Sequence, residues 1–274
     1  MQHLALIGFG AISRSLVATL CDQPDAGVRA LSLLVRSAPD KAHDAATQIC
    51  APLGIAVQVY TDLADLLAAK PDVVVECAGQ PAVAAYGEAV LRAGIDLVTA
   101  SVGAFADQAL FDRLKATASE TGAQIILPAG AIGGIDALVA ARLSGLEAVT
   151  YTGRKPPNGW AGTEAENRVD LAALTEPAVF FEGSAREAAT IFPKNANVAA
   201  TLALAGLGMD ATRVRLIADP HTRENTHEYQ VKSQAMDFAL SLTGKVSPLN
   251  PKTSLSTAYS LARVVLNRSG AIVI

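Results

Sequence analysis

Short apolar runs alternate with longer amphipathic stretches over the first 127 residues. The runs are bounded by Gly, Pro and Asp and fit buried strands, whereas the stretches between them have the 3.6-residue period of helices. The expected strands cover residues 3–7, 28–35, 55–60, 73–76, 97–100 and 124–127, and the expected helices cover 11–22, 40–51, 62–69, 81–93 and 107–121. Strand–helix alternation of this kind predicts right-handed βαβ units and a mostly parallel sheet. Residues 1–127 are therefore expected to form an α/β domain of the doubly wound Rossmann type.

The pattern changes after Pro128. A helix expected at 135–144 precedes longer runs with period-two alternation, at 146–152, 178–183, 213–218 and 226–232, which a helix at 197–207 interrupts. Longer strands with helices to one side indicate a second, smaller α+β domain over residues 128–249. The last segment, 250–274, contains a helix at 253–267 with one apolar face, which we expect to pack back on the first domain.

A glycine-rich turn follows the first expected strand and opens the first expected helix. Gly8 permits the tight turn, and Gly10 lets the backbone approach a pyrophosphate bound at the amides of Ala11 and Ile12. The third small position of the dinucleotide fingerprint is Ser13, which is still small enough for close helix–strand packing. The position of this turn at the first strand–helix junction predicts dinucleotide binding rather than a purely structural turn.

The end of the second expected strand distinguishes between two nicotinamide cofactors. NAD-specific sites place an Asp or Glu there for the ribose 2′-hydroxyl, but this chain has Arg36 and Ser37. Both side chains suit a 2′-phosphate, so we expect NADP to be accepted alongside NAD. The alternative is that Arg36 is a solvated loop residue.

Three further loops of small residues follow strand ends, at 76–81, 100–104 and 128–134, where open α/β sheets bind ligands. We expect Ala78 and Gly79 to contact the cofactor. Cys77 offers a thiol for aldehyde oxidation, but no histidine follows nearby, so a small buried cysteine in a tight turn is the favoured interpretation.

Composition and charge exclude several classes of protein. The net charge is −4 and no block of Lys or Arg is present, so nothing favours binding to nucleic acid or a membrane. Three scattered cysteines form no disulfide framework or metal-ligand cluster and suit a reducing compartment. The N-terminus resembles no secretory signal and no apolar run is long enough to span a bilayer, so we expect a cytoplasmic protein without a metal site.

One of the four histidines is expected to point inward. Alternation along residues 226–232 places His227, Tyr229 and Val231 on one face of a strand. His221 follows Asp219-Pro220 and is expected to be exposed in a turn. Periodicity alone leaves two roles open for His227, a catalytic residue or a hydrogen-bonded histidine of the core.

Together these stretches resemble the L-aspartate dehydrogenase family over nearly the whole chain. The resemblance rests on G-x-G-A-I at 8–12, V-V-E-C-A-G at 74–79, S-V-G-A at 101–104, G-A-I-G-G-I-D-A-L at 130–138, Y-T-G-R-K-P at 151–156, G-S-A-R-E-A-A at 183–189, P-K-N-A-N-V-A-A-T-L-A-L-A-G at 193–206, A-D-P at 218–220, E-N-x-H at 224–227 and N-P-K-T-S at 250–254. It implies a homodimer in which the second domain carries catalysis and dimerisation. It also implies NAD(P)-dependent oxidation of L-aspartate to iminosuccinate, then to oxaloacetate and ammonia, which would be reversible and would link the chain to NAD biosynthesis.

The resemblance also implies roles for single residues. The catalytic histidine falls on His227, and nicotinamide contacts fall on Ala131 and on Asn197, with Asn195 as second choice. Asparagine also suits the N-cap of the helix that begins there, and the two roles are compatible. The two substrate carboxylates need cationic or amide donors. The candidates are Lys194, Asn195, Arg154, Lys155 and Arg186.

Two other functions remain open at this point. The first is a reductase or dehydrogenase for another small amino acid or dicarboxylate, of the dihydrodipicolinate-reductase or homoserine-dehydrogenase kind. The second is a non-catalytic protein that senses NAD(P)H, which would need only the features of the first domain. An inward His227 beside the asparagine-rich segment 194–197 argues against the second.

Overall fold

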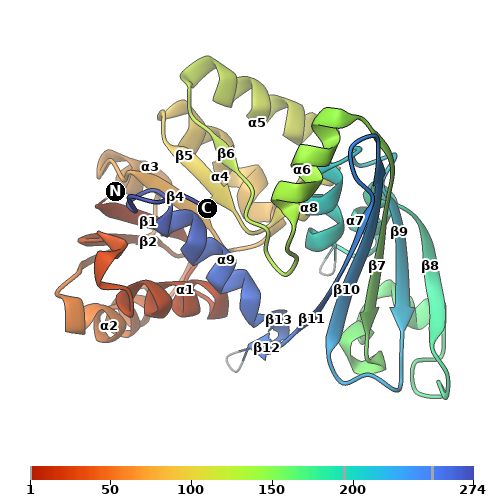
Figure 1. Cartoon of the computed structure of the whole chain (residues 1–274). Helices are drawn as coiled ribbons and strands as arrows, with labels where there is room; N and C mark the ends of the chain where they lie inside the picture. The colour runs from red at the N-terminus through yellow and green to blue at the C-terminus, as the bar shows by residue number, and fades with distance from the viewer. Residues whose placement is uncertain (1, 194–195, 248–249) are drawn as a thin grey trace. The chain divides into compact units, whose positions relative to one another are not determined.

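The computed structural model describes residues 2–193, 196–247 and 250–274 (Figure 1). The chain forms two compact units: unit 1 contains Met1–Pro128 and Thr257–Ile274, and unit 2 contains Ala129–Ser256. Unit 2 is therefore inserted between two segments of unit 1. Among the described helices, none is long and apolar enough to cross a membrane.

Unit 1 is built on a parallel sheet of six strands in the order β3-β2-β1-β4-β5-β6. The strands are β1 (His3–Ile7), β2 (Ala30–Leu34), β3 (Ala56–Tyr60), β4 (Val73–Glu76), β5 (Asp96–Thr99) and β6 (Ile125–Ile126). The direction of winding reverses between β1 and β4, and ligands bind at such a point beyond the carboxyl ends of the strands. The predicted Rossmann architecture is confirmed.

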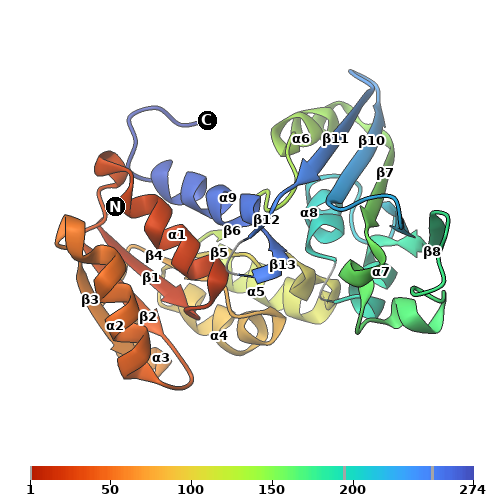
Figure 2. The same cartoon turned by 90° about the horizontal axis from the view of Figure 1, so that it is seen from below.

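Helices cover both faces of this sheet. They are α1 (Ala11–Cys21), α2 (Pro39–Cys50), α3 (Leu63–Ala68), α4 (Gln80–Arg92), α5 (Gln108–Thr121) and α9 (Leu255–Leu266). Buried side chains of α1, α2 and α9 form one core cluster with Leu4 and Leu6 of β1. The glycine Gly87 lets α4 approach Leu97 of β5 and Leu114 of α5 on the other face. Figure 2 shows α9 lying along α1 although the two helices are far apart in sequence.

Unit 2 contains a mixed sheet of five strands in the order β11-β10-β7-β9-β8. Its strands are β7 (Leu146–Lys155), β8 (Ala178–Ser184), β9 (Arg213–Ala218), β10 (Asn225–Ser233) and β11 (Phe238–Gly244), and its helices are α6 (Ile135–Ser144), α7 (Ala185–Ile191) and α8 (Asn197–Ala205). β7 is parallel to β9 and antiparallel to β10. A separate pair joins β12 (Val246–Ser247) to β13 (Asn250–Ser254). The predicted second α+β domain is thus present.

Several elements of unit 2 differ from the sequence-based expectation, including the unexpected short strands β12 and β13. β7 continues to Lys155, three residues beyond the expected end, which brings Gly153 and Lys155 into the sheet. β11 was not expected, because most of its residues are exposed and, among the described strands, it pairs with β10 alone. Helix α7 was also not expected, although a capping box between Ser184 and Glu187 marks its start.

Candidate functional site

The glycine turn of unit 1 is held by contacts that exclude larger residues. Gly8 has a φ of +87°, and a Cβ there would lie 2.8 Å from the Cβ of Ala78. The buried hydroxyl of Ser13 donates a hydrogen bond of 2.8 Å to the carbonyl oxygen of Gly8. Ser13 therefore joins the first turn of α1 to the end of β1, and the serine at the third position of the fingerprint suits this packing.

Gly10 differs from Gly8, because contacts within the described part of the chain do not exclude a larger residue there. It is the N-cap of α1, and a Cβ at Gly10 would meet no described atom within 4 Å. Ala11 and Ile12 follow as the first residues of the helix, whose terminal amides have no intrahelical acceptor. This open, uncapped helix start fits a pyrophosphate, which needs amide donors and close approach to the backbone.

A buried carboxylate joins the loops that follow β4 and β5. Glu76 is fully buried, and its Oε1 accepts hydrogen bonds from the amides of Ala78 (2.6 Å) and Gly79 (2.7 Å) and from the hydroxyl of Ser101 (3.0 Å). Its Oε2 accepts from the hydroxyl of Thr99 (2.8 Å) and from the amide of Ser101 (3.2 Å). Glu76 therefore holds the predicted cofactor contacts Ala78 and Gly79 in place.

Cys77 follows this carboxylate and is a poor nucleophile. Burial and the neighbouring charge of Glu76 both raise the pKa of the Cys77 thiol. The thiolate is the reactive form of cysteine, so a raised pKa disfavours covalent chemistry. These contacts agree with the interpretation of Cys77 as a structural residue.

The segment after β2 carries the predicted 2′-phosphate contacts. Val35 is buried, whereas Arg36 and Ser37 are exposed at the carboxyl end of the strand. Neither side chain forms a hydrogen bond or ion pair with the residues that the structure describes. The Arg36 guanidinium therefore has its donors available at the edge of the sheet where a ligand is expected.

In unit 2, His227 lies on the buried face of β10, as strand alternation predicts. It is 5% exposed, and Tyr229 and Val231 are buried on the same face. The Nδ1 atom of His227 lies 2.8 Å from the hydroxyl of Tyr151, which is on the neighbouring strand β7. Burial, followed by the charge of Lys155, lowers the pKa of His227 to about 4. The imidazole is therefore neutral at neutral pH.

Lys155, at the end of β7, is the cation that acts on His227. Alternation along β7 places Tyr151, Gly153 and Lys155 on the face that His227 shares, since His227 pairs with Gly153. The Nζ atom of Lys155 lies 4.8 Å from the centroid of the Trp160 ring. Burial lowers the pKa of Lys155 to about 8, so a fraction of its amine is neutral in mildly basic solution.

The loop that carries Ala131 is fixed to the same strand as His227. The hydroxyl of Tyr229 donates to the carbonyl oxygens of Gly133 (3.0 Å) and Gly134 (2.9 Å). Gly134 has a φ of +66°, and a Cβ there would lie 2.6 Å from that hydroxyl. The loop therefore docks on β10 two residues from His227.

The predicted substrate contacts fall into two groups. Arg154 donates to Asp219 (2.7 Å), and strand alternation places it on the face opposite Gly153 and His227. Arg186 forms a bidentate pair with Asp210 (2.6 and 2.9 Å). Both guanidinium groups thus have a carboxylate partner within the protein. Lys194 and Asn195 lie outside the described residues.

Asn197 does not occupy the expected N-cap position. The N-cap of α8 is Ala196, without a side-chain cap, and Asn197 is the first residue of the helix. Its side chain is exposed, so it remains a predicted cofactor contact. The expectation for His221 is confirmed, since this side chain is exposed and lies 3.4 Å from Glu176.

Sequence reasoning missed three residues of these sites, Glu76, Tyr151 and Gly153. Glu76 could have been found from the sequence, because an acidic residue at the end of a strand buried on both faces needs several hydrogen-bond donors around it. Tyr151 and Gly153 required the register between β7 and β10, which no local pattern provides.

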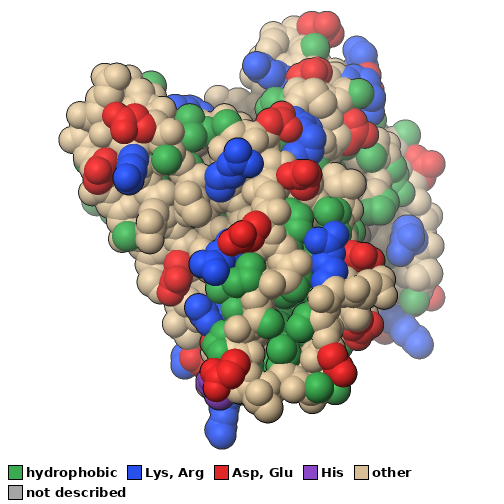
Figure 3. Space-filling view, turned by 90° about the vertical axis from the view of Figure 1, so that its right-hand side faces the viewer, with side chains coloured by type: hydrophobic (Ala, Val, Ile, Leu, Met, Phe, Trp, Pro, Cys, Tyr) green, Lys and Arg blue, Asp and Glu red, His purple; other side chains and the backbone are tan. Residues whose placement is uncertain are grey.

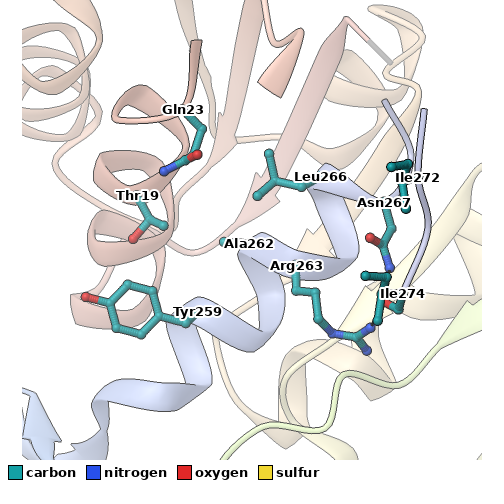
Figure 4. Close-up of a pocket in the computed structure, with 9 residues that line it drawn as sticks. All are labelled: Thr19, Gln23, Tyr259, Ala262, Arg263, Leu266, Asn267, Ile272 and Ile274. Carbon is teal, nitrogen blue, oxygen red and sulfur yellow. Dashed lines mark hydrogen bonds between the residues drawn. The ribbon is translucent and has the colours of Figure 1, made fainter. Parts of the chain in front are cut away.

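A pocket elsewhere in unit 1 contains none of the predicted site residues. It lies between α1, α9 and the last residues of the chain, and Tyr259 and Leu266 line it (Figure 4). Arg263 of α9 and Asn267, which directly follows the helix, donate to the backbone oxygen of Ile274 beside it. The pocket is therefore formed where the C-terminal segment packs against α1 and α9 of unit 1.

Comparison with known proteins covers the whole chain. Residues 136–268 match the family model described as aspartate dehydrogenase, C-terminal, and residues 8–128 match the NAD binding domain of homoserine dehydrogenase. The chain is 46% identical to L-aspartate dehydrogenase from Ralstonia pickettii, over 99% of both chains. It is 44% identical to the L-aspartate dehydrogenase from Pseudomonas aeruginosa, also over 99% of both chains.

A solved structure supports the same assignment. The crystal structure of aspartate dehydrogenase from Thermotoga maritima matches with a TM-score of 0.78 and 25% identity, and the match covers 100% of this chain and 99% of that one. The full-length identity, the two matching models and this shared fold agree with the resemblance seen in the sequence. The chain belongs to the L-aspartate dehydrogenase family.

Proposed function

We propose that this protein is an NAD(P)-dependent L-aspartate dehydrogenase, an oxidoreductase that acts on a CH–NH₂ group. The observation that carries the proposal is the buried, neutral imidazole of His227, held at Nδ1 by Tyr151 on the sheet face that Lys155 shares. A non-catalytic nucleotide-sensing protein would not need a desolvated acid–base group in its second unit. The full-length identity to L-aspartate dehydrogenases supports L-aspartate as the substrate.

The residues of unit 1 suit a nicotinamide dinucleotide. The uncapped start of α1 at Gly10 supplies amides for the pyrophosphate, and Arg36 with Ser37 would hold a 2′-phosphate. Ala78 and Gly79 follow β4, where the nicotinamide side of a dinucleotide is expected. Ala131 and Asn197 are the predicted contacts from unit 2. When bound, the nicotinamide accepts the hydride that leaves the α-carbon of aspartate.

His227 is the proposed acid–base residue. The α-ammonium of aspartate must lose a proton before the C–H bond breaks, and loss of the hydride then leaves iminosuccinate. Water adds to the imine carbon, the C–N bond breaks, and oxaloacetate and ammonia are released. The neutral imidazole can accept a proton from the ammonium or from the attacking water.

Cations are also needed for the two substrate carboxylates. Lys155 fits this role best among the described candidates, because it shares the face of His227. Arg154 and Arg186 would have to exchange Asp219 and Asp210 for the substrate. The roles predicted for Lys194 and Asn195 belong to the same proposal.

Assembly and location complete the proposal. We infer a homodimer, as is common for soluble oligomers. Figure 3, viewed from the side of β8, shows hydrophobic side chains gathered in one area with charged side chains around them. Val179 of β8 is 41% exposed. Static light scattering of the purified protein would measure the mass, which should be twice that of one chain.

The cysteines bear on the location of the protein. The structure contains three free thiols, Cys21, Cys50 and Cys77, and these favour a cytoplasmic location.

The central test is turnover of L-aspartate. NAD(P)H formation should be observed with L-aspartate and should be much weaker with D-aspartate, L-glutamate or L-homoserine. His227→Ala should lower kcat about 10²- to 10⁴-fold, because proton transfer is lost, while cofactor affinity measured by fluorescence titration stays the same. His221→Ala is the matched control, since that histidine is exposed, and should retain full activity.

Two results would contradict the proposal. Absence of activity on L-aspartate in a protein that binds the cofactor would exclude the substrate. Turnover of L-homoserine or another small acid in its place would favour the alternative class of dehydrogenase. Near-normal turnover by His227→Ala would remove this histidine from the mechanism.

A further inference from the structure

Tyr151 and His227 form a buried, hydrogen-bonded pair inside unit 2. Tyr151 is 1% exposed and His227 is 5% exposed, and 2.8 Å separates the tyrosine hydroxyl from Nδ1. Their rings are nearly parallel, with an interplanar angle of 18° and centroids 6.1 Å apart. Among the described residues, the imidazole is the only hydrogen-bond partner of this hydroxyl. The orientation of the ring is therefore set by one side chain on the neighbouring strand.

Gly153 provides the space in which this hydrogen bond forms. It pairs with His227 across β7 and β10, and it lies two residues from Tyr151 on the same face. A Cβ at Gly153 would be 2.7 Å from the Tyr151 hydroxyl and 3.2 Å from Cζ of the same ring. Its φ is not in the left-handed region, so the backbone conformation does not require glycine here. Glycine is required because a side chain would clash with the tyrosine hydroxyl.

We propose that Tyr151 is a positioning residue for His227, and that Gly153 is the position that admits the Tyr151 hydroxyl. This inference rests on the proposed catalytic role of His227. Because Nδ1 is occupied by Tyr151, the imidazole presents Nε2 to the substrate. For Nε2 to accept a proton, Nδ1 must carry the hydrogen of the neutral ring, so the Tyr151 oxygen accepts a hydrogen bond from Nδ1–H. Nδ1 keeps this hydrogen in the imidazolium, so the same contact holds the ring before and after Nε2 takes up a proton.

A purely structural role would look different, and Tyr229 provides the example. The hydroxyl of Tyr229 lies on the same sheet face but donates to two backbone carbonyls, those of Gly133 and Gly134. It anchors a loop and contacts no titratable side chain through these bonds. Tyr151 instead bonds to the group whose protonation state the reaction changes.

The test compares Tyr151→Phe with Tyr229→Phe in the full-length protein. Tyr151→Phe should lower kcat for L-aspartate about tenfold, in line with the loss of orientation of an acid–base group. Its KM for cofactor should change by less than about twofold. The ¹⁵N resonances of His227 should shift, because the Nδ1 hydrogen bond is lost. Tyr229→Phe should leave those resonances in place.

Gly153→Ala gives an independent arm. Its added methyl group should displace the hydroxyl, so kcat should fall and the His227 resonances should move as in Tyr151→Phe. In a Tyr151→Phe background the same alanine should cost much less, which is the non-additivity expected of coupled residues. Thermal unfolding identifies any variant that fails to fold, and the remaining variant then carries the test.

The outcomes separate this inference from the proposed function. Normal kcat and unchanged His227 resonances in Tyr151→Phe would overturn the positioning role while leaving L-aspartate oxidation intact. If the protein did not oxidise L-aspartate, the NMR arm would still decide whether Tyr151 holds the imidazole. Equal, additive losses for Gly153→Ala with and without the hydroxyl would show that Gly153 serves another purpose.

Discussion

At the scale of single residues, Glu76 of unit 1 is a fully buried carboxylate that depends on hydrogen bonds from its neighbours. Both oxygens of its buried carboxylate face donors, and five hydrogen bonds to four residues meet there. Those donors come from the loops after β4 and β5, which flank the place where a nicotinamide is expected. A glutamine amide would keep only one of these two acceptors, because its NH₂ group would replace an oxygen that faces N–H and O–H donors.

Glu76→Gln should therefore be strongly destabilising despite its conserved shape. We expect the free energy of unfolding to fall by about 3 kcal/mol, since donors facing the new NH₂ group lose their partner in a buried site. Cofactor affinity should fall as well, because the turn at Ala78 and Gly79 loses its anchor. Urea unfolding and fluorescence titration measure the two effects.

Glu88→Gln is the control for this substitution. Glu88 pairs with Arg92 and Arg113 on the partly exposed surface of α4, where water and salt screen ion pairs and they contribute little to stability. Its stability and cofactor affinity should stay close to those of the parent protein. If Glu76→Gln behaved like Glu88→Gln, the network around Glu76 would not hold the cofactor loops.

At the scale of elements, the exposed segment after β2 is the part of unit 1 from which we predict that the protein accepts NADP as well as NAD. Arg36→Ala should weaken NADP binding about tenfold relative to NAD, which corresponds to loss of one hydrogen bond to a charged group. Isothermal titration with both cofactors measures this ratio. Arg29→Ala removes an exposed cation just before β2 and should leave the ratio unchanged. An unchanged ratio in Arg36→Ala would make Arg36 a solvated loop residue.

Local patterns were sufficient for most elements of unit 1 and for the buried face of β10. Period-two alternation identifies His227 and Tyr229 as inward residues without any knowledge of a partner strand. The parallel strands of unit 1 are continuous apolar runs because helices cover both faces, and such runs are easily recognised. The same patterns indicate the glycine turn at Gly8, because strand, turn and helix are contiguous there.

Long-range pairing could not be predicted in the same way. The contact between Tyr151 and His227 joins residues 76 positions apart and depends on the register of two strands. A shift of one residue would move every side chain of β7 to the other face. The edge strand β11 has one neighbour and many exposed residues, so it lacks the apolar pattern of a buried strand.

At the scale of the whole molecule, the buried histidine should make stability depend on pH. The pKa of His227 is about 4 in the folded state, against 6.5 for an unperturbed histidine. Between these values the unfolded chain binds the extra proton, so the free energy of unfolding falls as the pH drops from about 6.5 to about 4. The full effect is about 3 kcal/mol. Urea unfolding at a series of pH values measures it.

His227→Gln is the control for this pH dependence and should flatten the profile within that window. Asp72 acts at lower pH. The backbone amides of His3 and Gln2 lower the pKa of Asp72 from 3.8, so protonation of Asp72 weakens the fold as the pH falls below that value. A parent protein whose stability stayed constant between pH 6.5 and 4 would contradict the buried, neutral state of His227.

The insertion of unit 2 within unit 1 has a consequence for synthesis on the ribosome. Leu261, Ala262 and Val265 of α9 are part of the core that covers β1, yet they are translated after all of unit 2. The nascent nucleotide-binding unit therefore carries an uncovered apolar surface, including Leu16 and Val17 of α1, throughout the synthesis of unit 2. Unit 2 is contiguous in sequence and can fold first. The core of unit 1 is thus completed only after all of unit 2 has been translated.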